Sequence, residues 1–272
     1  NHSRRTQVQK ALRHGELRVH YQPKVNMRHR QVVGMEALIR WQHPEQGLLG
    51  PGHFLPLVEN TDVIVDLGEW VLHQALAQIA QWVAQGQQWT VSVNIAARHF
   101  HREDFVSRLK TILAAYPSVA PSLLELEILE SAALEDVQHM CQVMRACQAL
   151  GVCFALDDFG TGFSSLSYLK RLPAETIKID QIFIRGLLDD HDDLTLVVAI
   201  VGLATAFQRK VIAEGVETMA QGERLLQLGC ELGQGFGIAR PMPAADVLPW
   251  AARYQHTAAV INTPQTSPAP GR

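Results

Sequence analysis

The sequence predicts an α/β fold, a single TIM-like (β/α)8 barrel whose first strand runs antiparallel to its neighbour. Short apolar runs alternate with longer segments of helical period, which is typical of a parallel sheet covered by helices. Eight such runs fit into about 250 residues, the usual length of a (β/α)8 barrel. No linker-like composition interrupts residues 17–252, so we expect one domain over that range. A doubly wound open sheet is the alternative arrangement.

Eight apolar, often β-branched runs are the candidate strands. They cover residues 17–21, 32–41, 90–95, 123–129, 152–156, 176–179, 210–213 and, more weakly, 233–238. Only a short polar link, residues 26–31, separates the first run from the second. Because a parallel crossover needs about a dozen residues or more, we expect these two strands to be antiparallel, which departs from a regular barrel.

Four segments repeat apolar residues with the period of a helix. They cover residues 65–85, 137–150, 194–207 and 219–228. Gly86, Gly151 and Gly229 follow three of these segments, where a left-handed C-cap residue is expected. Residues 1–16 are interpreted as a lead-in from a longer chain, because the sequence begins at Asn1 rather than at Met. Residues 253–272, which end in Thr, Pro, Ser and Gly, are expected to form a flexible tail.

Composition excludes several classes of protein. The 272 residues are 47% hydrophobic and carry a net charge of −3, which indicates a folded globular chain rather than a disordered one. This near-neutral balance argues against a nucleic-acid polymer as partner. No apolar stretch reaches the ~18 residues of a membrane span, so we expect no membrane contact by this segment. Four cysteines without a C-x-x-C pair indicate reduced thiols and a cytoplasmic location. The same expectation holds if the chain is the cytoplasmic part of a larger, membrane-anchored protein.

Polar side chains recur where the predicted strands end. Six successive strands contribute them, namely Glu36, Asn94, Glu127, Asp157 with Asp158, Lys178 and Glu214. An ionised side chain inside an apolar strand is costly unless it is paired or bound to a metal. Since the carboxyl ends of the strands in a barrel converge on one mouth, we expect these groups to form one site.

The residue types indicate the chemistry of this site. Carboxylates and one amide, without His or Cys, favour hard cations such as Mg²⁺ or Mn²⁺. The adjacent Asp157 and Asp158 would let one carboxylate face each of two ions, an arrangement that is common in phosphodiester cleavage. The residues alone leave two other interpretations open. One is an enolase-like enzyme, and the other is a structural ion-pair network around Lys178 and Arg40.

A series of short motifs follows along the chain. They are Tyr21-Gln-Pro23, Glu36-Ala-Leu-x-Arg40, Ser92-Val-Asn94, Glu127-x-x-Glu130, Asp157-Asp-Phe-Gly-Thr-Gly162, Ile177-Lys-Ile-Asp180, Glu214-Gly-Val-Glu217 and Gly233-Gln-Gly235. Their order and spacing resemble those of the EAL-domain family of cyclic-di-GMP phosphodiesterases. The resemblance implies a hydrolase of bacterial second-messenger signalling that opens cyclic-di-GMP to linear pGpG with two Mg²⁺ or Mn²⁺ ions.

The resemblance also implies roles at the metal site. The positions that match ligands of a first metal are Glu36, Asn94, Glu127 and Asp157. Asp158 matches the second-metal side, with Asp157 bridging, and Glu214 matches a carboxylate that has also been proposed as general base. Lys178 matches the lysine that holds the attacking water. A lysine among carboxylates stays protonated, so we assign it to orientation and electrostatics. Glu36, Lys178 and Glu214 are thus the candidate catalytic residues.

Other positions match residues that contact the dinucleotide or surround the site. The candidate substrate contacts are Gln22, Leu38, Arg40, Glu217 and Gln234. The guanidinium of Arg40 suits a phosphate, whereas Gln22 and Gln234 also fit as capping side chains at strand ends. Glu130 matches the anchor of the loop that holds Gly160 and Gly162, and Asp180 lies at the edge of the site. The family implies that this loop couples homodimerisation to activity.

Four positions depart from residues that are frequent in the family. Ala96, Leu129, Phe163 and Phe236 each lack a hydroxyl that is common there. None of them is an expected metal ligand, so we predict an active enzyme. The alternative is a catalytically silent receptor for cyclic-di-GMP, but such relatives usually lack several of the ligands. The chain contains no Gly-Gly-Asp-Glu-Phe cyclase motif, so any sensor or cyclase domain is expected upstream, in a longer protein.

Overall fold

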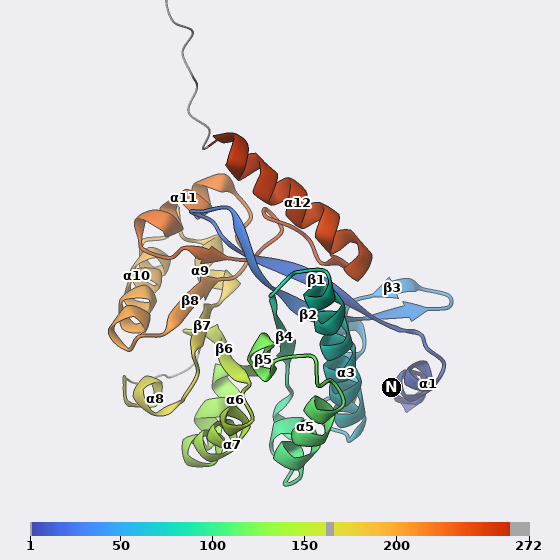
Figure 1. Ribbon diagram of the computed structural model, residues 1–272. Coiled ribbons are helices and arrows are strands. Elements are labelled where there is room, and N and C mark those ends of the chain that lie inside the picture. Colours follow the sequence, from blue (N-terminus) through green and yellow to red (C-terminus); the bar gives the residue numbers. More distant parts are fainter. Residues whose placement is uncertain (1, 162–165, 262–272) are drawn as a thin grey trace, which may run out of the picture.

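Eight strands pair side by side into a closed ring in the computed structural model (Figure 1), which describes residues 2–161 and 166–261. They are β1 (Leu17–Asn26), β2 (Gln31–His43), β4 (Thr90–Asn94), β5 (Leu124–Leu129), β6 (Cys153–Phe159), β7 (Thr176–Ile179), β8 (Lys210–Ala213) and β9 (Leu232–Gly233). The ring closes because β1 pairs with both β9 and β2. Two short strands, β3 (Gly47–Leu49) and β10 (Met242–Pro243), pair with β2 and β1. The structure therefore confirms the predicted barrel and differs from the alternative, a doubly wound open sheet.

The first two strands form a long antiparallel hairpin. Their pairing runs from Leu17 opposite Trp41 to Asn26 opposite Gln31. The link between them is a tight turn in which Arg30 adopts a left-handed backbone (φ 48°). β1 also runs antiparallel to β9, whereas the neighbours from β2 round to β9 are parallel. The antiparallel first strand predicted from the short link is therefore confirmed.

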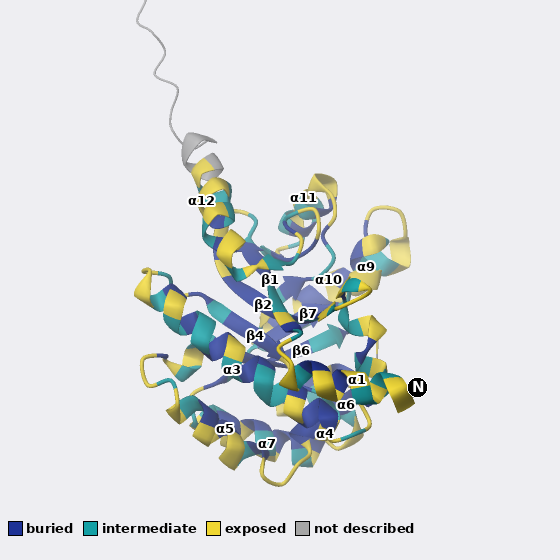
Figure 2. Cartoon of the chain, turned by 90° about the vertical axis from the view of Figure 1, so that its right-hand side faces the viewer, coloured by how far each residue is buried: buried dark blue, intermediate teal, exposed yellow. Residues whose placement is uncertain are grey.

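Helices cover the outside of the ring. They are α1 (His2–Arg13), α2 (Leu55–Val58), α3 (Val63–Ala84), α4 (Ala97–Phe100), α5 (Phe105–Ala114), α6 (Glu130–Glu135), α7 (Val137–Ala149), α8 (Leu166–Arg171), α9 (Gln181–Arg185), α10 (His191–Ala206), α11 (Met219–Gln227) and α12 (Ala244–Ile261). The four periodic segments correspond to α3, α7, α10 and α11. Gly86, Gly151 and Gly229 have φ values of 86°, 104° and 90° after α3, α7 and α11, as predicted. The strands beneath are largely buried, while the helices carry most of the exposed residues (Figure 2).

The last barrel strand is shorter than predicted. The expected strand at 233–238 is wrong in its extent, since β9 ends at Gly233 and a turn follows. Gly235 lies so close to Val216 that a β-carbon on it would fall 2.3 Å from the Val216 backbone nitrogen. The chain therefore leaves the sheet after Gly233 and packs against the segment that follows β8.

The two ends of the described chain are helical, although the C-terminal end was expected to be flexible. Residues 253–261, assigned to a flexible tail, continue α12. Pro249 lies inside this helix, and because proline is unfavourable in a helix interior, the sequence pattern did not indicate it. The lead-in contains α1, which buries Val8 and Ala11 in the core. Across the part of the chain that the structure describes, no helix is both long and apolar enough to cross a membrane.

Candidate active site

Alternate residues of the barrel strands point into the ring, and many of them are polar. The inner polar residues are Gln22 and Lys24 on β1, Glu36 on β2, Ser92 and Asn94 on β4, Glu125 and Glu127 on β5, and Lys178 on β7; all but Asn94 are buried. The interior of such a barrel is usually filled by layers of branched apolar side chains. This ring instead encloses charges, which are tolerated in a buried place only when they are paired.

Lys178 lies at the centre of this interior with its side chain 1% exposed. Its Nζ lies 3.0 Å from Glu36 Oε1 and 3.0 Å from each carboxylate oxygen of Glu127. Glu214 Oε1 lies at 3.2 Å and Asp157 Oδ1 at 4.0 Å from the same atom. Burial alone would lower the pKa of Lys178, but these carboxylates outweigh it and raise the pKa well above its usual value. Lys178 is therefore a fixed cation rather than a proton acceptor.

Glu36 accepts hydrogen bonds from residues of β4, β7 and the turn after β9. Its Oε1 accepts hydrogen bonds from Lys178 and from Gln234 Nε2 at 2.7 Å, and its Oε2 accepts from Asn94 Nδ2 at 2.9 Å. Gln234 also donates to Gln22 Oε1 at 2.9 Å. Burial opposes ionisation of Glu36, but the ammonium groups of Lys178 and Lys24 and the two amide donors outweigh it and lower its pKa to about 2. Glu36 is thus charged at any physiological pH.

A second group of carboxylates lies at the ends of β6 and β8. One oxygen each of Asp157, Asp158 and Glu214 lies within 4.8 Å of the others, a spacing that suits a metal ion. Burial and the charge of Asp157 raise the pKa of Asp158 to about 6, and burial raises the pKa of Glu214 well above its usual value. Asp158 also has a left-handed backbone (φ 53°), which is uncommon for a residue other than glycine and is found at functional sites. A cation here would relieve the repulsion among these carboxylates.

The charges of the interior fit two divalent cations. Among the described residues, six carboxylates (Glu36, Glu125, Glu127, Asp157, Asp158 and Glu214) meet two ammonium groups (Lys24 and Lys178). Six minus two leaves four formal negative charges, which two divalent ions would match. In a protein without ions, carboxylates take up protons instead: burial and the charge of Glu36 raise the pKa of Glu127 to about 7. The oxygen donors present are those that Mg²⁺ and Mn²⁺ prefer.

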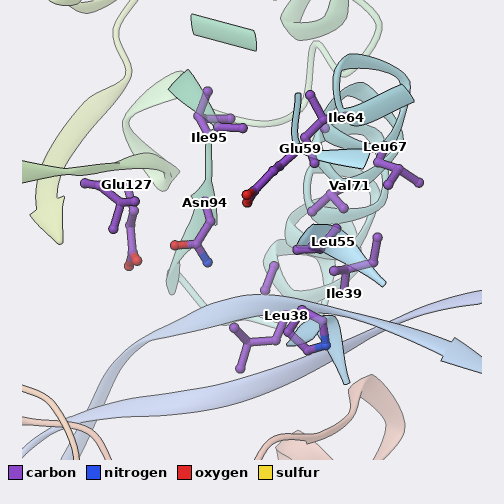
Figure 3. Close-up of a pocket in the computed structure, with 15 residues that line it drawn as sticks. Leu38, Ile39, Leu55, Glu59, Ile64, Leu67, Val71, Asn94, Ile95 and Glu127 are labelled. Carbon is purple, nitrogen blue, oxygen red and sulfur yellow. The ribbon is translucent and has the colours of Figure 1, made fainter. Parts of the chain in front are cut away.

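Two cavities open beside these charges. The smaller, of about 180 Å³, has a lining that includes Gln22, Glu36, Asp157, Glu214, Glu217 and Gln234. The larger, of about 330 Å³, is mostly apolar and is lined by residues of β2, β4 and α3 (Figure 3). Leu38 lines this apolar pocket, together with Asn94 and Glu127, and Glu59 projects into it. Three of the five candidate substrate contacts thus share the polar cavity, and Leu38 lines the apolar one.

Arg40 and the residues expected around the site lie farther out. Arg40 is half-buried and donates to the carbonyl of Ile39 at 2.9 Å; among the described residues, no carboxylate lies within 4.0 Å of its guanidinium. Asp180 caps α9, because its Oδ1 accepts from the backbone N–H of Ile182 at 2.8 Å. Its charge also helps to raise the pKa of Asp158.

The loop anchor and the loop itself were also expected near the site. Glu130 is buried at the start of α6. Gly160 (φ 98°) packs against Phe183 and Ile200, with no room for a β-carbon. Gly162 and Phe163 lie outside the described residues.

Three inner residues were missed by the sequence reasoning. Lys24, Ser92 and Glu125 are buried beside Glu127, and Lys24 Nζ lies 3.0 Å from Glu127 Oε1. Each of the three lies two positions from an expected site residue on its own strand. Because residues two apart share a face of a strand, this spacing was the signal that could have found them.

The fold and the site together define a (β/α)8-barrel protein whose mouth carries a cluster of carboxylates around a buried lysine. The EAL domain family matches residues 5–241, and the chain belongs to that family. The match reaches into α1, which we had placed outside the barrel. It ends at the turn before β10, so it covers all eight strands of the ring.

Individual relatives agree with this assignment. The chain is 46% identical over 242 residues to the bifunctional diguanylate cyclase/cyclic di-GMP phosphodiesterase MucR of Pseudomonas aeruginosa. The aligned region covers 89% of this chain and 35% of MucR. The chain is also 39% identical over 249 residues to the cyclic di-GMP phosphodiesterase PdeR of Escherichia coli, covering 92% of this chain and 37% of PdeR. The chain thus spans about a third of the length of these relatives.

Solved structures share the fold over most of the chain. The PaMucR phosphodiesterase in complex with c-di-GMP superposes with a TM-score of 0.86 at 45% identity, covering 89% of this chain and 98% of that one. The EAL enzyme Bd1971, with cAMP and cyclic-di-GMP bound, gives a TM-score of 0.85 at 30% identity, covering 91% of this chain and 68% of that one. The barrel with an antiparallel first strand is therefore the fold of EAL enzymes.

Proposed function

We propose that this chain is a phosphodiesterase that hydrolyses cyclic-di-GMP to linear pGpG with the help of two divalent cations. The observation that carries the proposal is the convergence of six carboxylates on only two ammonium groups, in the barrel interior and at its mouth. Relatives named cyclic di-GMP phosphodiesterases, and a solved relative in complex with c-di-GMP, support the choice of substrate.

The proposed ligands divide into two sets. Glu36, Asn94 and Glu127, with Asp157, would hold one ion; Asp157, Asp158 and Glu214 would hold the other. Divalent ions in such a site supply an activated water nucleophile and stabilise the leaving oxygen. The short distances among the last three carboxylates and the raised pKa of Asp158 support the second set. Glu214 would then accept the proton of the attacking water, because burial raises its pKa above the usual value and so makes its carboxylate a stronger base.

The remaining polar residues would bind and orient the dinucleotide. Lys178, held by four carboxylates, would place its ammonium group beside the attacking water and the phosphate. Gln22, Glu217 and Gln234 line the polar cavity and would contact the substrate there. The half-buried guanidinium of Arg40, which has no carboxylate within 4.0 Å among the described residues, would meet a phosphate. The apolar pocket with Leu38 offers a surface for a base.

Incubation with cyclic-di-GMP tests this proposal directly. With Mg²⁺ or Mn²⁺, we expect conversion to pGpG, measured by separation of the nucleotides. A chelator should abolish turnover, and excess Mg²⁺ should restore it, because four interior charges need cations. If cyclic-di-GMP binds without turnover under either metal, the chain is a receptor instead. The complete set of expected ligands favours the enzyme.

The pKa values predict how metal binding depends on pH. In the metal-free fold, Asp158 and Glu127 keep protons up to about pH 6 and about pH 7, whereas the unfolded chain loses them near pH 4. Their raised pKa values contribute stability that is lost as pH rises through these folded values. Metal binding needs the deprotonated carboxylates. We therefore expect Mg²⁺ to raise the melting temperature more at pH 8 than at pH 6.

Scans with and without Mg²⁺ at both pH values measure this effect. At each pH, the melting temperature without Mg²⁺ is subtracted from that with Mg²⁺. This subtraction removes the contribution of titrating groups away from the site, such as His99, because burial lowers the pKa of His99 to about 4 with or without the ion. An equal shift at pH 6 and pH 8 would contradict the assignment of these carboxylates as ligands.

Homodimerisation stays a prediction from the family resemblance. α10 offers a surface for it, because Leu196 and Val198 are 41% and 48% exposed on a helix that also buries Ile200. Ile200 contacts the position of Gly160, so the same helix packs against the loop beside the acidic cluster. Sedimentation across protein concentrations would measure the oligomeric state, and a monomer at all concentrations would contradict the prediction.

A further inference from the structure

A buried ion cluster lies on the inner face of β1, β4 and β5. Lys24 is 7% exposed, and its Nζ lies 3.2 Å from Glu125 Oε1 and 3.0 Å from Glu127 Oε1. The same ammonium group donates to Ser92 Oγ, and that hydroxyl donates to Glu125 Oε1 at 2.7 Å. Lys24, Ser92 and Glu125 therefore form a closed triad of mutual contacts, which we call the Lys24 triad, with Glu127 bound at its edge.

The Lys24 triad lies deeper in the barrel than the residues of the mouth. β1 runs antiparallel to β2, so Gln22 pairs opposite Glu36 while Lys24 pairs opposite Gly34, nearer the start of β2. Ser92 and Glu125 likewise precede Asn94 and Glu127 on parallel strands. The order along each strand thus places the triad one layer below the expected metal ligands.

Glu127 is consequently held by two lysines. Its Oε1 accepts from Lys24 and from Lys178, each at 3.0 Å, and its Oε2 accepts from Lys178 at 3.0 Å. Of the two lysines, Lys178 also contacts Glu36 and Glu214, so the position of Lys178 depends on several partners. Lys24 has its own anchor in Glu125 and Ser92. Lys24 can therefore hold one oxygen of Glu127 from the deeper layer of the barrel, and its position does not depend on the contacts of the residues at the mouth.

We propose that Lys24 is a positioning residue, which holds the Glu127 carboxylate through the Lys24 triad in the orientation needed for cation binding and turnover. This inference rests on the proposed function, in which Glu127 is a metal ligand. The competing explanation is that Lys24 only balances the buried charge of Glu125. Replacing both charges of that pair separates the two explanations, because the double replacement leaves the interior charge unchanged.

The deciding variant is Lys24→Met with Glu125→Gln. The amide keeps an oxygen that can accept from Ser92, and methionine keeps most of the lysine stem, so we expect a folded barrel. Without a donor below it, Glu127 should bind cations less well. Partners that orient metal ligands contribute about 10- to 100-fold to affinity or activity. We expect a loss of that size both in Mn²⁺ affinity, measured by calorimetry without substrate, and in kcat, with KM unchanged.

The single variant Glu125→Gln is the matched control. It keeps the contact between Lys24 and Glu127 and removes only the charge of Glu125, so its losses of Mn²⁺ affinity and kcat should be much smaller than those of the double variant. Equal losses in the two variants would contradict the inference. A folded double variant with wild-type Mn²⁺ affinity and kcat would overturn the inference. If the double variant does not fold, Lys24→Gln with Glu125→Gln keeps one donor for Glu127 and should show a smaller loss of the same two quantities. Failure of the proposed function would appear separately, as a wild-type chain that does not hydrolyse cyclic-di-GMP.

Discussion

Replacement of Lys178 by methionine is expected to lower kcat for cyclic-di-GMP hydrolysis by about 10²- to 10³-fold, the usual effect of removing one electrostatic donor from an active site. The physical reason is the position of its ammonium group, which lies within 3.2 Å of oxygens from Glu36, Glu127 and Glu214. Methionine fills the same space without a charge or a donor. The developing charge on the phosphate would then lack its nearest cation from the protein.

The variant should nevertheless fold. Loss of one partner of a buried ion pair usually costs several kcal/mol, but Glu127 already has a pKa of about 7. It can therefore take up a proton and limit that cost. Circular dichroism would verify folding, and product analysis would give kcat. Lys210→Met is a matched control, because Lys210 is an exposed lysine on the next strand, β8. A folded Lys178→Met variant with nearly unchanged kcat would refute the assigned role.

Replacement of Glu36 by glutamine is expected to lower kcat by about 100-fold or more, since even residues that merely support a metal ligand contribute up to about 100-fold. Glu36 has a lowered pKa of about 2, so the change removes a full negative charge at neutral pH. It also removes an acceptor. One carboxylate oxygen accepts hydrogen bonds from Lys178 and Gln234, and the other accepts one from Asn94. The amide nitrogen of glutamine cannot accept a hydrogen bond from any of these donors.

Metal affinity gives this prediction a second measurement. We expect weaker Mn²⁺ binding by calorimetry together with the loss of kcat, because one of the carboxylates that match the cation charge is gone. Glu45→Gln provides the comparison, since Glu45 is an exposed glutamate in the turn that follows β2. Wild-type Mn²⁺ affinity in a folded Glu36→Gln protein would show that Glu36 is not a ligand.

The strand pattern was predictable because its causes are local. Runs of apolar residues identify seven of the eight barrel strands well, and the short link after β1 fixes the direction of the hairpin. The eighth strand was drawn too long, because Gly235 is held by the backbone of Val216, a contact that no local pattern records. α12 was missed for a related reason. Its Pro249 reads as a helix breaker, yet the helix buries Val247 and Ala251 against the barrel.

The candidate site was predictable in its membership but not in its arrangement. The carboxylates at strand ends were expected to form one site that holds two metal ions, without any indication of how they contact the lysine between them. The structure arranges them in two groups that meet at Lys178: Glu36 and Glu127 contact its ammonium group, while Asp157 and Glu214, which also approach it, cluster with Asp158. This partition follows from where each strand ends in the ring, which the residue types do not encode.

The sequence by itself determined the order of the strands, the antiparallel start of the barrel and the oxygen-donor residues that its mouth carries. These features depend on the spacing of apolar residues, the length of the links and the residue types, all of which can be read from residues that are near one another in the sequence. Only the tertiary structure decided that Lys24 and Glu127, 103 positions apart, share a hydrogen bond. Closure of the ring sets the register between β1, β4 and β5 and thereby the depth of each inner side chain. A contact of that kind is a property of the closed barrel, because no single strand contains both partners.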